Sequence, residues 1–176
     1  MAQPASQEEL FALLAKLEIP HRTTSHAPVF TVDEARALRG DIPGGHTKNL
    51  FLQDRKGRLF LAVTLEDVPV DLKALSTQAA ASGRLSFASA DVLRQTLGVE
   101  PGSVTPFALI NDHARLVTPM FDASMLEVSP LNFHPLHNTA TTGIAAKDLL
   151  RFAQALGFTP LCPRFPRREP QAIVPE

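Results

Sequence analysis

The sequence has no tryptophan, no tyrosine and a single cysteine, Cys162. One thiol excludes an internal disulfide framework. Without tryptophan or tyrosine, any stacking against a nucleic-acid base falls to phenylalanine, histidine or arginine. The chain also lacks an apolar run of about 18 residues and a basic start followed by an apolar stretch, so we expect a cytoplasmic protein with no membrane contact.

The net charge of the whole chain is also small, at -1. Proteins that coat long nucleic acids are usually basic, because their affinity comes largely from neutralising phosphates. Broad nucleic-acid coating is therefore disfavoured, whereas contact with a short nucleic-acid end stays open. The length of 176 residues is typical of one domain with a full-sized core.

The hydrophobic pattern predicts helices mixed with strands. Helices are expected over residues 6–17, 31–38, 70–81, 90–98 and 145–157, and strands over 21–25, 48–54, 58–64, 84–89, 107–112, 114–121, 125–130 and within 132–144. Capping boxes are expected at Ser6 with Glu9 and at Thr31 with Glu34, and Gly40 is expected to stop the second helix. Because most strands follow one another as hairpins, we expect an α+β fold with a mixed or antiparallel sheet flanked by helices.

The stretch "GDIPGGHTKNLFL", residues 40–52, has some features of a phosphate-binding loop. Against the pattern G-x-x-x-x-G-K-[ST], however, His46 stands in the lysine position and Lys48 comes two residues late. A helix precedes this loop and a strand follows, the reverse of the order that phosphate loops use. The interpretation that survives is a turn that brings Lys48 to the first position of a strand. The alternative is an ordinary solvent-exposed lysine at a strand edge.

Other candidates for chemistry are individually weak. One interpretation of His134 and His137 in "HPLH" is a metal site. No third ligand follows at a recognisable spacing, which favours a structural role for at least one of these histidines. There is no serine elbow, and Cys162 lies between two prolines, a poor setting for a nucleophile. The loop "GSVTP", residues 102–106, offers backbone N–H groups to an oxyanion, or is simply a connection. The segment "NTATTGI", residues 138–144, either lines a polar pocket or caps the last helix.

The order of several strings is more specific than any of them alone. "HTKNLFL", "VDLKALS", "RLSFAS", "LGVEPGSVTPFALIND" and "NFHPLHNTATTGI" followed by "DLLRF" occur in this sequence order. Together they resemble the prolyl-tRNA editing family, which comprises YbaK-like free-standing deacylases and the editing domain inserted in bacterial prolyl-tRNA synthetases. The resemblance covers about residues 6–158. Within the family, the chain looks most like the free-standing branch that hydrolyses alanine mischarged onto proline tRNA.

This resemblance implies the fold, the site and the partners. It implies a compact α+β domain over residues 1–158 with a strongly curved sheet, followed by a proline-rich tail over residues 159–176. It also implies a reaction without metal, cofactor or covalent intermediate, on the acceptor end of tRNA(Pro) carrying alanine, with prolyl-tRNA synthetase as a further partner. The implied catalytic residues are Lys48 and the loop residues Gly102, Ser103 and Val104. Because a lysine is ordinarily cationic, we expect Lys48 to hold the terminal phosphate or ribose, and we expect the loop amides to stabilise the oxyanion. The implied substrate-binding residues are Asn49, Thr105, Pro106 and His134, the last of which bounds the amino-acid pocket. The residues themselves add His26, Thr31 and Asn138 as candidate pocket borders.

Three other functions stay open at this point. Within the family, the substrate is cysteinyl- or seryl-tRNA instead. Outside it, the chain is a non-catalytic module that binds tRNA ends or a synthetase, or an esterase for small molecules. The last is disfavoured by the missing serine elbow and metal motif.

Overall fold

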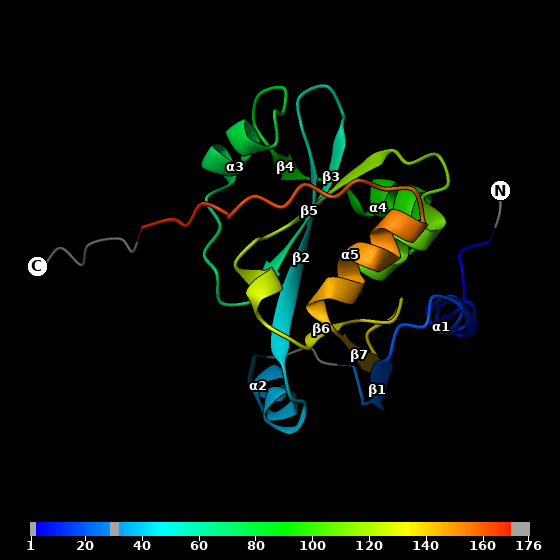
Figure 1. The fold of residues 1–176 in the computed structure, drawn as a ribbon. Coiled ribbons are helices and arrows are strands. Elements are labelled where there is room, and N and C mark those ends of the chain that lie inside the picture. The colour runs from blue at the N-terminus through cyan, green and yellow to red at the C-terminus, as the bar shows by residue number, and fades with distance from the viewer. Residues whose placement is uncertain (1–2, 29–31, 170–176) are drawn as a thin grey trace, which may run out of the picture.

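A mixed β-sheet with helices packed around it organises the computed structural model, which describes residues 3–28 and 32–169 (Figure 1). The helices are α1 (Gln7–Lys16), α2 (Val32–Asp41), α3 (Leu72–Gln78), α4 (Ala90–Leu97) and α5 (Ala146–Ala155), with 3₁₀ turns η1 (Pro106–Asn111) and η2 (Met125–Glu127). The strands are β1 (His21–Ser25), β2 (Gly45–Gln53), β3 (Leu59–Leu65), β4 (Ser86–Phe87), β5 (Val117–Phe121), β6 (Leu131–Phe133) and β7 (Ala140–Ile144). The α+β class predicted from the sequence is confirmed. No helix of the described part is long and apolar enough to cross a membrane.

The sheet has the strand order β1-β7-β6-β2-β3-β5, and β4 pairs with β2. The predicted β2–β3 hairpin is present, while β2–β6 and β3–β5 are parallel, which makes the sheet mixed. On one side of β2, β6 pairs only with Gly45 and His46, and β4 pairs only with Leu52 and Gln53. The Phe51 carbonyl also accepts from the Ala88 N–H, just after β4, at 3.0 Å. Between β6 and this bond, residues 47–50 of β2 form a stretch with no strand partner on that side among the described residues. We call this stretch the open edge of β2.

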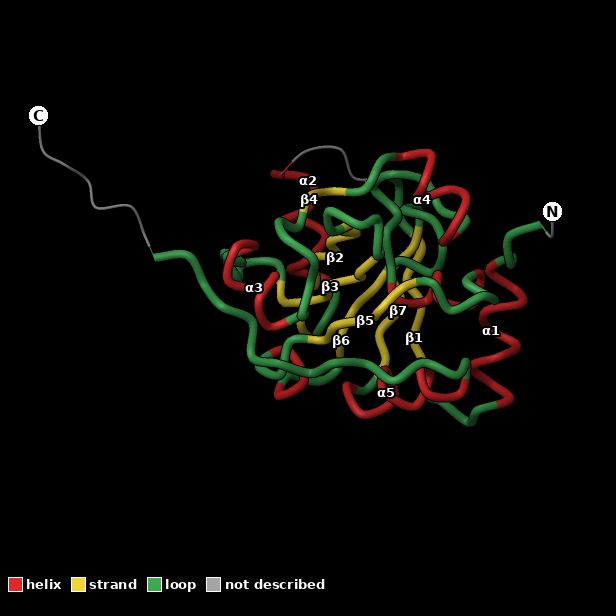
Figure 2. Tube along the Cα trace, turned by 90° about the horizontal axis from the view of Figure 1, so that it is seen from above, coloured by secondary structure: helices red, strands yellow, loops and turns green. Residues whose placement is uncertain are grey.

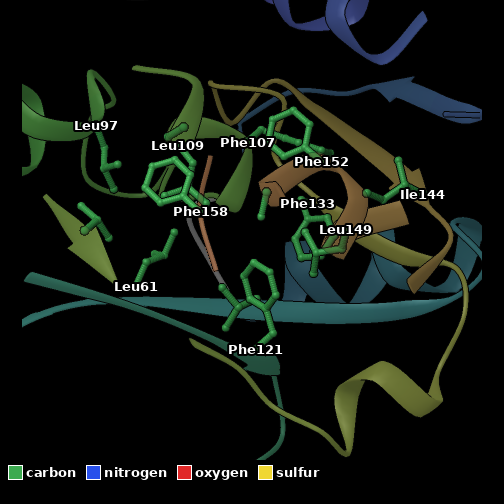
Figure 3. Close-up of a cluster of buried hydrophobic side chains, with 14 of the residues drawn as sticks. Leu61, Leu97, Phe107, Leu109, Phe121, Phe133, Ile144, Leu149, Phe152 and Phe158 are labelled. Carbon is green, nitrogen blue, oxygen red and sulfur yellow. The ribbon is translucent and has the colours of Figure 1, made fainter. Parts of the chain in front are cut away.

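Two hydrophobic clusters lie on opposite faces of β2 and β3. Phe51, Leu61 and Val63 belong to the larger cluster, which packs against α1, α4, η1 and α5 and includes the aromatic side chains in Figure 3. Leu52 and Phe60 belong to the smaller cluster, which packs against α3. Because side chains alternate along a strand, Asn49 shares the face of Phe51, whereas Lys48 and Leu50 share the face of Leu52.

Two predicted strands are 3₁₀ turns instead. Residues 107–112 lie in and just beyond η1, which begins at Pro106 and is capped by the Thr105 hydroxyl accepting from the Phe107 N–H. Residues 125–130 begin with η2. Both segments are short apolar runs, for which period alone does not distinguish a strand from a buried turn. Because proline lacks an N–H and sets the φ of a first helical position, Pro106 favours the helical start.

The region before β2 also differs from expectation. Gly40 lies inside α2, which continues to Asp41, so it does not stop the helix. The predicted cap at Thr31 lies outside the described residues. The capping box at Ser6 and Glu9 is confirmed. Lys48 is the fourth residue of β2 and not the first, because Gly45 and His46 already pair with β6.

Gly44 makes the turn into β2 possible. Its φ is +107°, and a Cβ on it would lie 2.5 Å from the Pro130 carbonyl oxygen. Only glycine tolerates both the backbone conformation and this close approach. The glycines in the loop therefore serve the packing of β2 against β6.

We expect Gly44→Ala to lower the free energy of unfolding by about 2 kcal/mol or more, because it adds overpacking to backbone strain. Urea denaturation of the purified protein measures this change. Gly40→Ala is the matched control, since nothing lies within 4 Å of its added Cβ and alanine favours a helix over glycine by about 1 kcal/mol. Equal stability of Gly44→Ala and wild type would contradict the packing argument.

Residues 160–168 form an extended segment that we call the C-terminal strap. It runs along the outer edge of β5, where the Phe121 N–H donates to the Leu161 carbonyl at 2.8 Å and the Leu161 N–H donates to the Pro119 carbonyl at 2.9 Å. It then crosses toward α3, as the orange-to-red trace in Figure 1 and the view from above in Figure 2 show. Phe165 of the strap is buried in the smaller cluster. The strap thus covers a sheet edge that would otherwise present unpaired backbone groups.

Buried Asp122 holds the strap in place. Its carboxylate accepts hydrogen bonds from the Thr64 hydroxyl at 2.6 Å, from the Phe165 N–H at 3.0 Å and from both donors of Ser124. Burial pushes the pKa of Asp122 upward, but these hydrogen bonds together outweigh burial and hold the pKa below its ordinary value. The ionised carboxylate therefore links β3, β5 and the strap.

Candidate functional site

A small cavity lies where α2, the first half of β2, β6, β7 and the loop before η1 meet, with a volume of about 200 Å³. Its lining residues are Leu38, His46, Thr47, Asn49, Glu66, Gly102, Asn132, Phe133, His134, Asn138 and Thr141. Pockets that enclose drug-sized ligands usually measure about 300–1,000 Å³. This cavity therefore suits a small group, such as one amino-acid side chain with its backbone.

Asn49 brings an unpaired acceptor to this cavity. Its Oδ1 is buried and has no hydrogen-bond partner among the residues that the structure describes. A buried polar atom without a partner costs about 1–3 kcal/mol, so such atoms are rare unless a ligand uses them. Asn49 lines the cavity, so its unpaired amide oxygen lies beside the space in which a ligand would bind.

His134 lines the same cavity and is kept neutral. Its Nδ1 donates to the Ala140 carbonyl at 3.2 Å, which leaves Nε2 as an acceptor in the neutral ring. Burial lowers the pKa of His134 below its ordinary value of 6.5, and the nearby His26 and His137 lower it further, against the opposing effect of the Ala140 carbonyl. At neutral pH, His134 is therefore an uncharged hydrogen-bond acceptor.

The lowered pKa of His134 makes stability depend on pH. As the pH falls through 6.5, the unfolded chain takes up a proton at this position while the folded protein resists it. We therefore expect the free energy of unfolding to decrease between 6.5 and the lower pKa of the folded state, and the decrease to be smaller in His134→Gln. Urea denaturation from pH 7.5 to 5.5 measures this difference. The exposed His113, changed to Gln, is the control, and an unchanged pH profile in His134→Gln would contradict the prediction.

Only one residue of the predicted "GSVTP" loop lines the cavity. Gly102 does so with a φ of +88°, in a turn closed by the Ser103 N–H donating to the Glu100 carbonyl at 3.0 Å. That bond engages the Ser103 amide, which sequence analysis assigned to the substrate. Thr105 and Pro106 are buried, and Val104 packs against the larger hydrophobic cluster. The loop therefore presents its turn to the cavity and anchors its remainder in the core.

Lys48 does not line this cavity. It lies in a separate depression, together with Leu50, Phe87 and Arg168. Burial lowers the pKa of Lys48 from its ordinary 10.5, the charge of Arg168 lowers it further, and Asp67 opposes both. The structure thus places the two adjacent residues Lys48 and Asn49 on opposite faces of β2, in two different depressions.

Of the remaining predicted residues, some line the cavity and others hold neighbouring residues in place. Asn138 lines the cavity. His26 does not, but its Nε2 pairs with the Thr141 hydroxyl at 2.8 Å and its Nδ1 with the Ala27 carbonyl at 2.9 Å, so it fixes a residue that does. His137 pairs with the Gln7 side chain of α1 and has the structural role expected of one histidine of "HPLH". Thr31 lies outside the described residues. Within the described ranges, no three His, Cys, Asp or Glu side chains gather where a metal ion could bind.

Several residues that line the cavity were not predicted from the sequence. Thr47 and Asn132 are linked by a hydrogen bond of 2.7 Å from the Thr47 hydroxyl to the Asn132 carbonyl, and the Asn132 amide donates to the Pro43 and Gly45 carbonyls. Thr47 was detectable, because it precedes Asn49 by two positions and so shares its face of β2. Leu38 and Glu66 come to the cavity only through tertiary packing.

Comparison with known proteins places this arrangement in a family. Residues 26–152 match the family model described as the aminoacyl-tRNA editing domain. The prolyl-tRNA editing protein ProX of Acetoanaerobium sticklandii is 35% identical over 155 residues, which covers 88% of this chain and 94% of that protein. The prolyl-tRNA synthetase associated domain-containing protein 1 of Danio rerio is 38% identical over 157 residues, covering 88% and 85%. A solved structure described as a candidate trans-editing enzyme for prolyl-tRNA synthetase has a TM-score of 0.67 at 18% identity, covering 92% of this chain and 98% of that chain.

Proposed function

Because the chain belongs to the aminoacyl-tRNA editing domain family, we propose that it is a trans-acting deacylase that hydrolyses the ester of alanine wrongly attached to tRNA(Pro). The substrate class follows the prolyl-tRNA editing relative ProX. The choice of alanine follows the resemblance of the motifs around Lys48, Gly102 and His134 to the alanine-specific branch. Prolyl-tRNA synthetase is the natural partner, because it produces the mischarged tRNA.

The observation that carries this proposal is the pair of acceptors in the small cavity. Asn49 Oδ1 is buried without a partner in the described part of the chain, and His134 Nε2 is the acceptor of a neutral ring. An aminoacyl ester carries an α-ammonium group with several N–H donors, and an ammonium prefers such acceptors. The amino acid then lies in the cavity with its charged group on Asn49 and His134.

The chemistry that this proposal requires is modest. An ester is already activated, so positioning and stabilisation of the developing negative charge are enough. Water adds to the ester carbonyl, the carbonyl oxygen becomes an oxyanion, and the bond to the ribose oxygen breaks as that oxygen takes a proton. The turn at Gly102 is the element of this chain placed to offer a backbone N–H to the oxyanion. The resemblance further implies that the neighbouring ribose hydroxyl assists the attack.

Amino-acid choice rests on size in this proposal. Phe133 and His134 are walls of a cavity of about 200 Å³, where Phe133 packs against Phe107 and His134 bonds to the Ala140 carbonyl. Excluding a larger side chain by steric clash is easier than excluding a smaller one, for which a methylene yields only about 1–3 kcal/mol. The cavity then admits alanine and excludes proline.

Lys48 acts on the nucleic acid in this proposal and not on the amino acid. It lies across β2 from Asn49, and the open edge of β2 separates the two faces. A substrate that crosses this edge places its amino acid in the cavity and its terminal ribose or phosphate beside Lys48.

Deacylation of tRNA(Pro) charged with radiolabelled Ala, Cys, Ser or Pro tests the function. We expect the alanine ester to be cleaved fastest and the proline ester to survive. Asn49→Leu is expected to lower kcat/KM for the alanine ester by about tenfold or more, because one charge-assisted hydrogen bond is lost. Fastest cleavage of Cys- or Ser-tRNA would move the substrate within the family. Binding of tRNA without turnover by wild type would instead identify a non-catalytic module.

A further inference from the structure

The depression that contains Lys48 is a second site with its own character. It has a volume of about 420 Å³ and is lined by Lys48, Leu50, Val70, Asp71, Leu72, Lys73, Phe87 and Arg168. It adjoins a groove of about 690 Å³ along α3, with which it shares Leu72 and Lys73 and which also contains Arg84. Figure 1 shows the elements that form it, with α3 and β4 near one end of β2 and the strap approaching from β5. We call the depression the β4–strap shelf.

An exposed aromatic ring forms one side of the shelf. Phe87 ends the short strand β4, beside Leu52 of β2, and is 63% exposed. An exposed large apolar side chain indicates a binding surface when it lies beside a depression and charged groups. A flat exposed ring next to cations is the arrangement with which proteins stack an unpaired base.

The other side of the shelf carries positive charge. Lys48 comes from β2, Lys73 from α3 and Arg168 from the strap. The position of Arg168 is fixed by its backbone, because its N–H donates to the Pro69 carbonyl at 2.7 Å. Arg168 is close enough to Lys48 that its charge lowers the pKa of the lysine. An anion bound between them would relieve this repulsion.

Two carboxylates lie near these cations. Asp71 lines the shelf but is engaged as the cap of α3, where it accepts from the Ala74 N–H at 3.1 Å. Asp67 lies near Lys48 and partly offsets the effect of Arg168. Neither Asp67 nor Asp71 forms an ion pair with Lys48, Lys73 or Arg168 in the described chain. The cations are therefore left for a ligand.

We propose that the β4–strap shelf binds the single-stranded 3′ end of a tRNA, with a base stacked on Phe87 and phosphates beside Lys48 and Arg168. The inference rests on the proposed function, which it extends from the amino acid to the RNA. The ester then passes over the open edge of β2 into the cavity that Asn49 and His134 line. A local basic shelf also reconciles RNA binding with a net charge of -1, because only a short end is held.

Binding of an uncharged single-stranded RNA that ends in CCA tests the shelf independently of catalysis. Fluorescence anisotropy with a 5′-labelled oligonucleotide at low salt gives the Kd. We expect Phe87→Ala and Arg168→Glu each to raise Kd by about tenfold, since one stacked base or one phosphate contact is lost. For Arg168→Gln we also expect the slope of log K against log salt to become shallower by about 0.7, because one phosphate contact is missing.

Two residues of matching type outside the shelf serve as controls. Arg164→Ala removes another exposed strap arginine, one that pairs with Glu127 at 3.2 Å outside the shelf. Leu116→Ala removes another exposed large apolar side chain, 62% exposed. Both are expected to bind the oligonucleotide as wild type does. Circular dichroism of all variants checks that they are folded.

The outcomes separate this inference from the proposed function. If wild type deacylates alanyl-tRNA(Pro) but Phe87→Ala and Arg168→Glu bind the oligonucleotide like wild type, the shelf is wrong and the function stands. If wild type binds the oligonucleotide with the expected loss in both variants but cleaves no ester, the shelf stands and the function is wrong. If wild type does not bind the oligonucleotide at all, an acidic protein partner becomes the better occupant and the RNA proposal is overturned.

Discussion

Lys48→Ala is expected to lower kcat/KM for deacylation of alanyl-tRNA(Pro) by about 100-fold. This corresponds to about 2.7 kcal/mol, within the range of a hydrogen bond to a charged group. Lys48 is the one cation of the shelf that also borders the open edge of β2, so we expect it to contact the nucleotide nearest to the ester. The resemblance to the editing family independently marks this lysine as essential. Steady-state deacylation with radiolabelled alanine measures the effect.

Two further variants show whether the effect depends on the positive charge of Lys48 and on its position. Lys48→Arg keeps the positive charge and is expected to retain much more activity than Lys48→Ala. Lys147→Ala removes an exposed lysine of α5 away from both depressions and is expected to match wild type. Full activity of Lys48→Ala would exclude the role proposed for this side chain.

His134→Ala is expected to lower the preference for alanine over proline by about 100-fold, measured as the ratio of kcat/KM values for Ala-tRNA(Pro) and Pro-tRNA(Pro). The imidazole is a wall of the small cavity, and its orientation is fixed by the bond from Nδ1 to the Ala140 carbonyl. Its removal leaves space for the larger proline ring, so a steric exclusion worth about 2.7 kcal/mol is lost.

The variant His134→Phe separates the size of this wall from its hydrogen bond. Phenylalanine keeps a ring in the cavity but removes the Nε2 acceptor. We expect it still to exclude proline while it cleaves the alanine ester more slowly. If His134→Ala kept the preference of wild type, size selection would have to come from another wall, such as Phe133 or Leu38.

The fold was largely predictable, because its strongest signals are local. The cap of α1 at Ser6, the Gly98 end of α4 and the β2–β3 hairpin follow from side-chain chemistry within a few residues. The two wrong strands, at η1 and η2, were short segments in which apolar residues such as Phe107, Leu109 and Met125 are buried. Their conformation depends on what packs around them, which a short window of sequence does not contain.

The site was predictable by residue type but not by arrangement. The sequence predicted one site that contains Lys48, Asn49, His134 and the Gly102 loop. The structure brings Asn49, His134 and Gly102 to one cavity and places Lys48 in another depression. Side chains alternate between the two faces of β2, so the adjacent residues Lys48 and Asn49 lie on opposite faces. This separation can be predicted once the register of β2 in the sheet is known.

The sequence by itself determined the family, the α+β class, the helix caps and the absence of a disulfide framework, since these depend on composition, on local chemistry and on an ordered set of strings. Only the tertiary structure decided that Asn49 Oδ1 is buried without a partner, that His134 is held neutral, and that Arg168 of the strap lies beside Lys48. The physical reason is distance along the chain. Residues far apart in sequence bury one another, shift one another's pKa and together form the β4–strap shelf. These properties therefore exist only after the chain has packed.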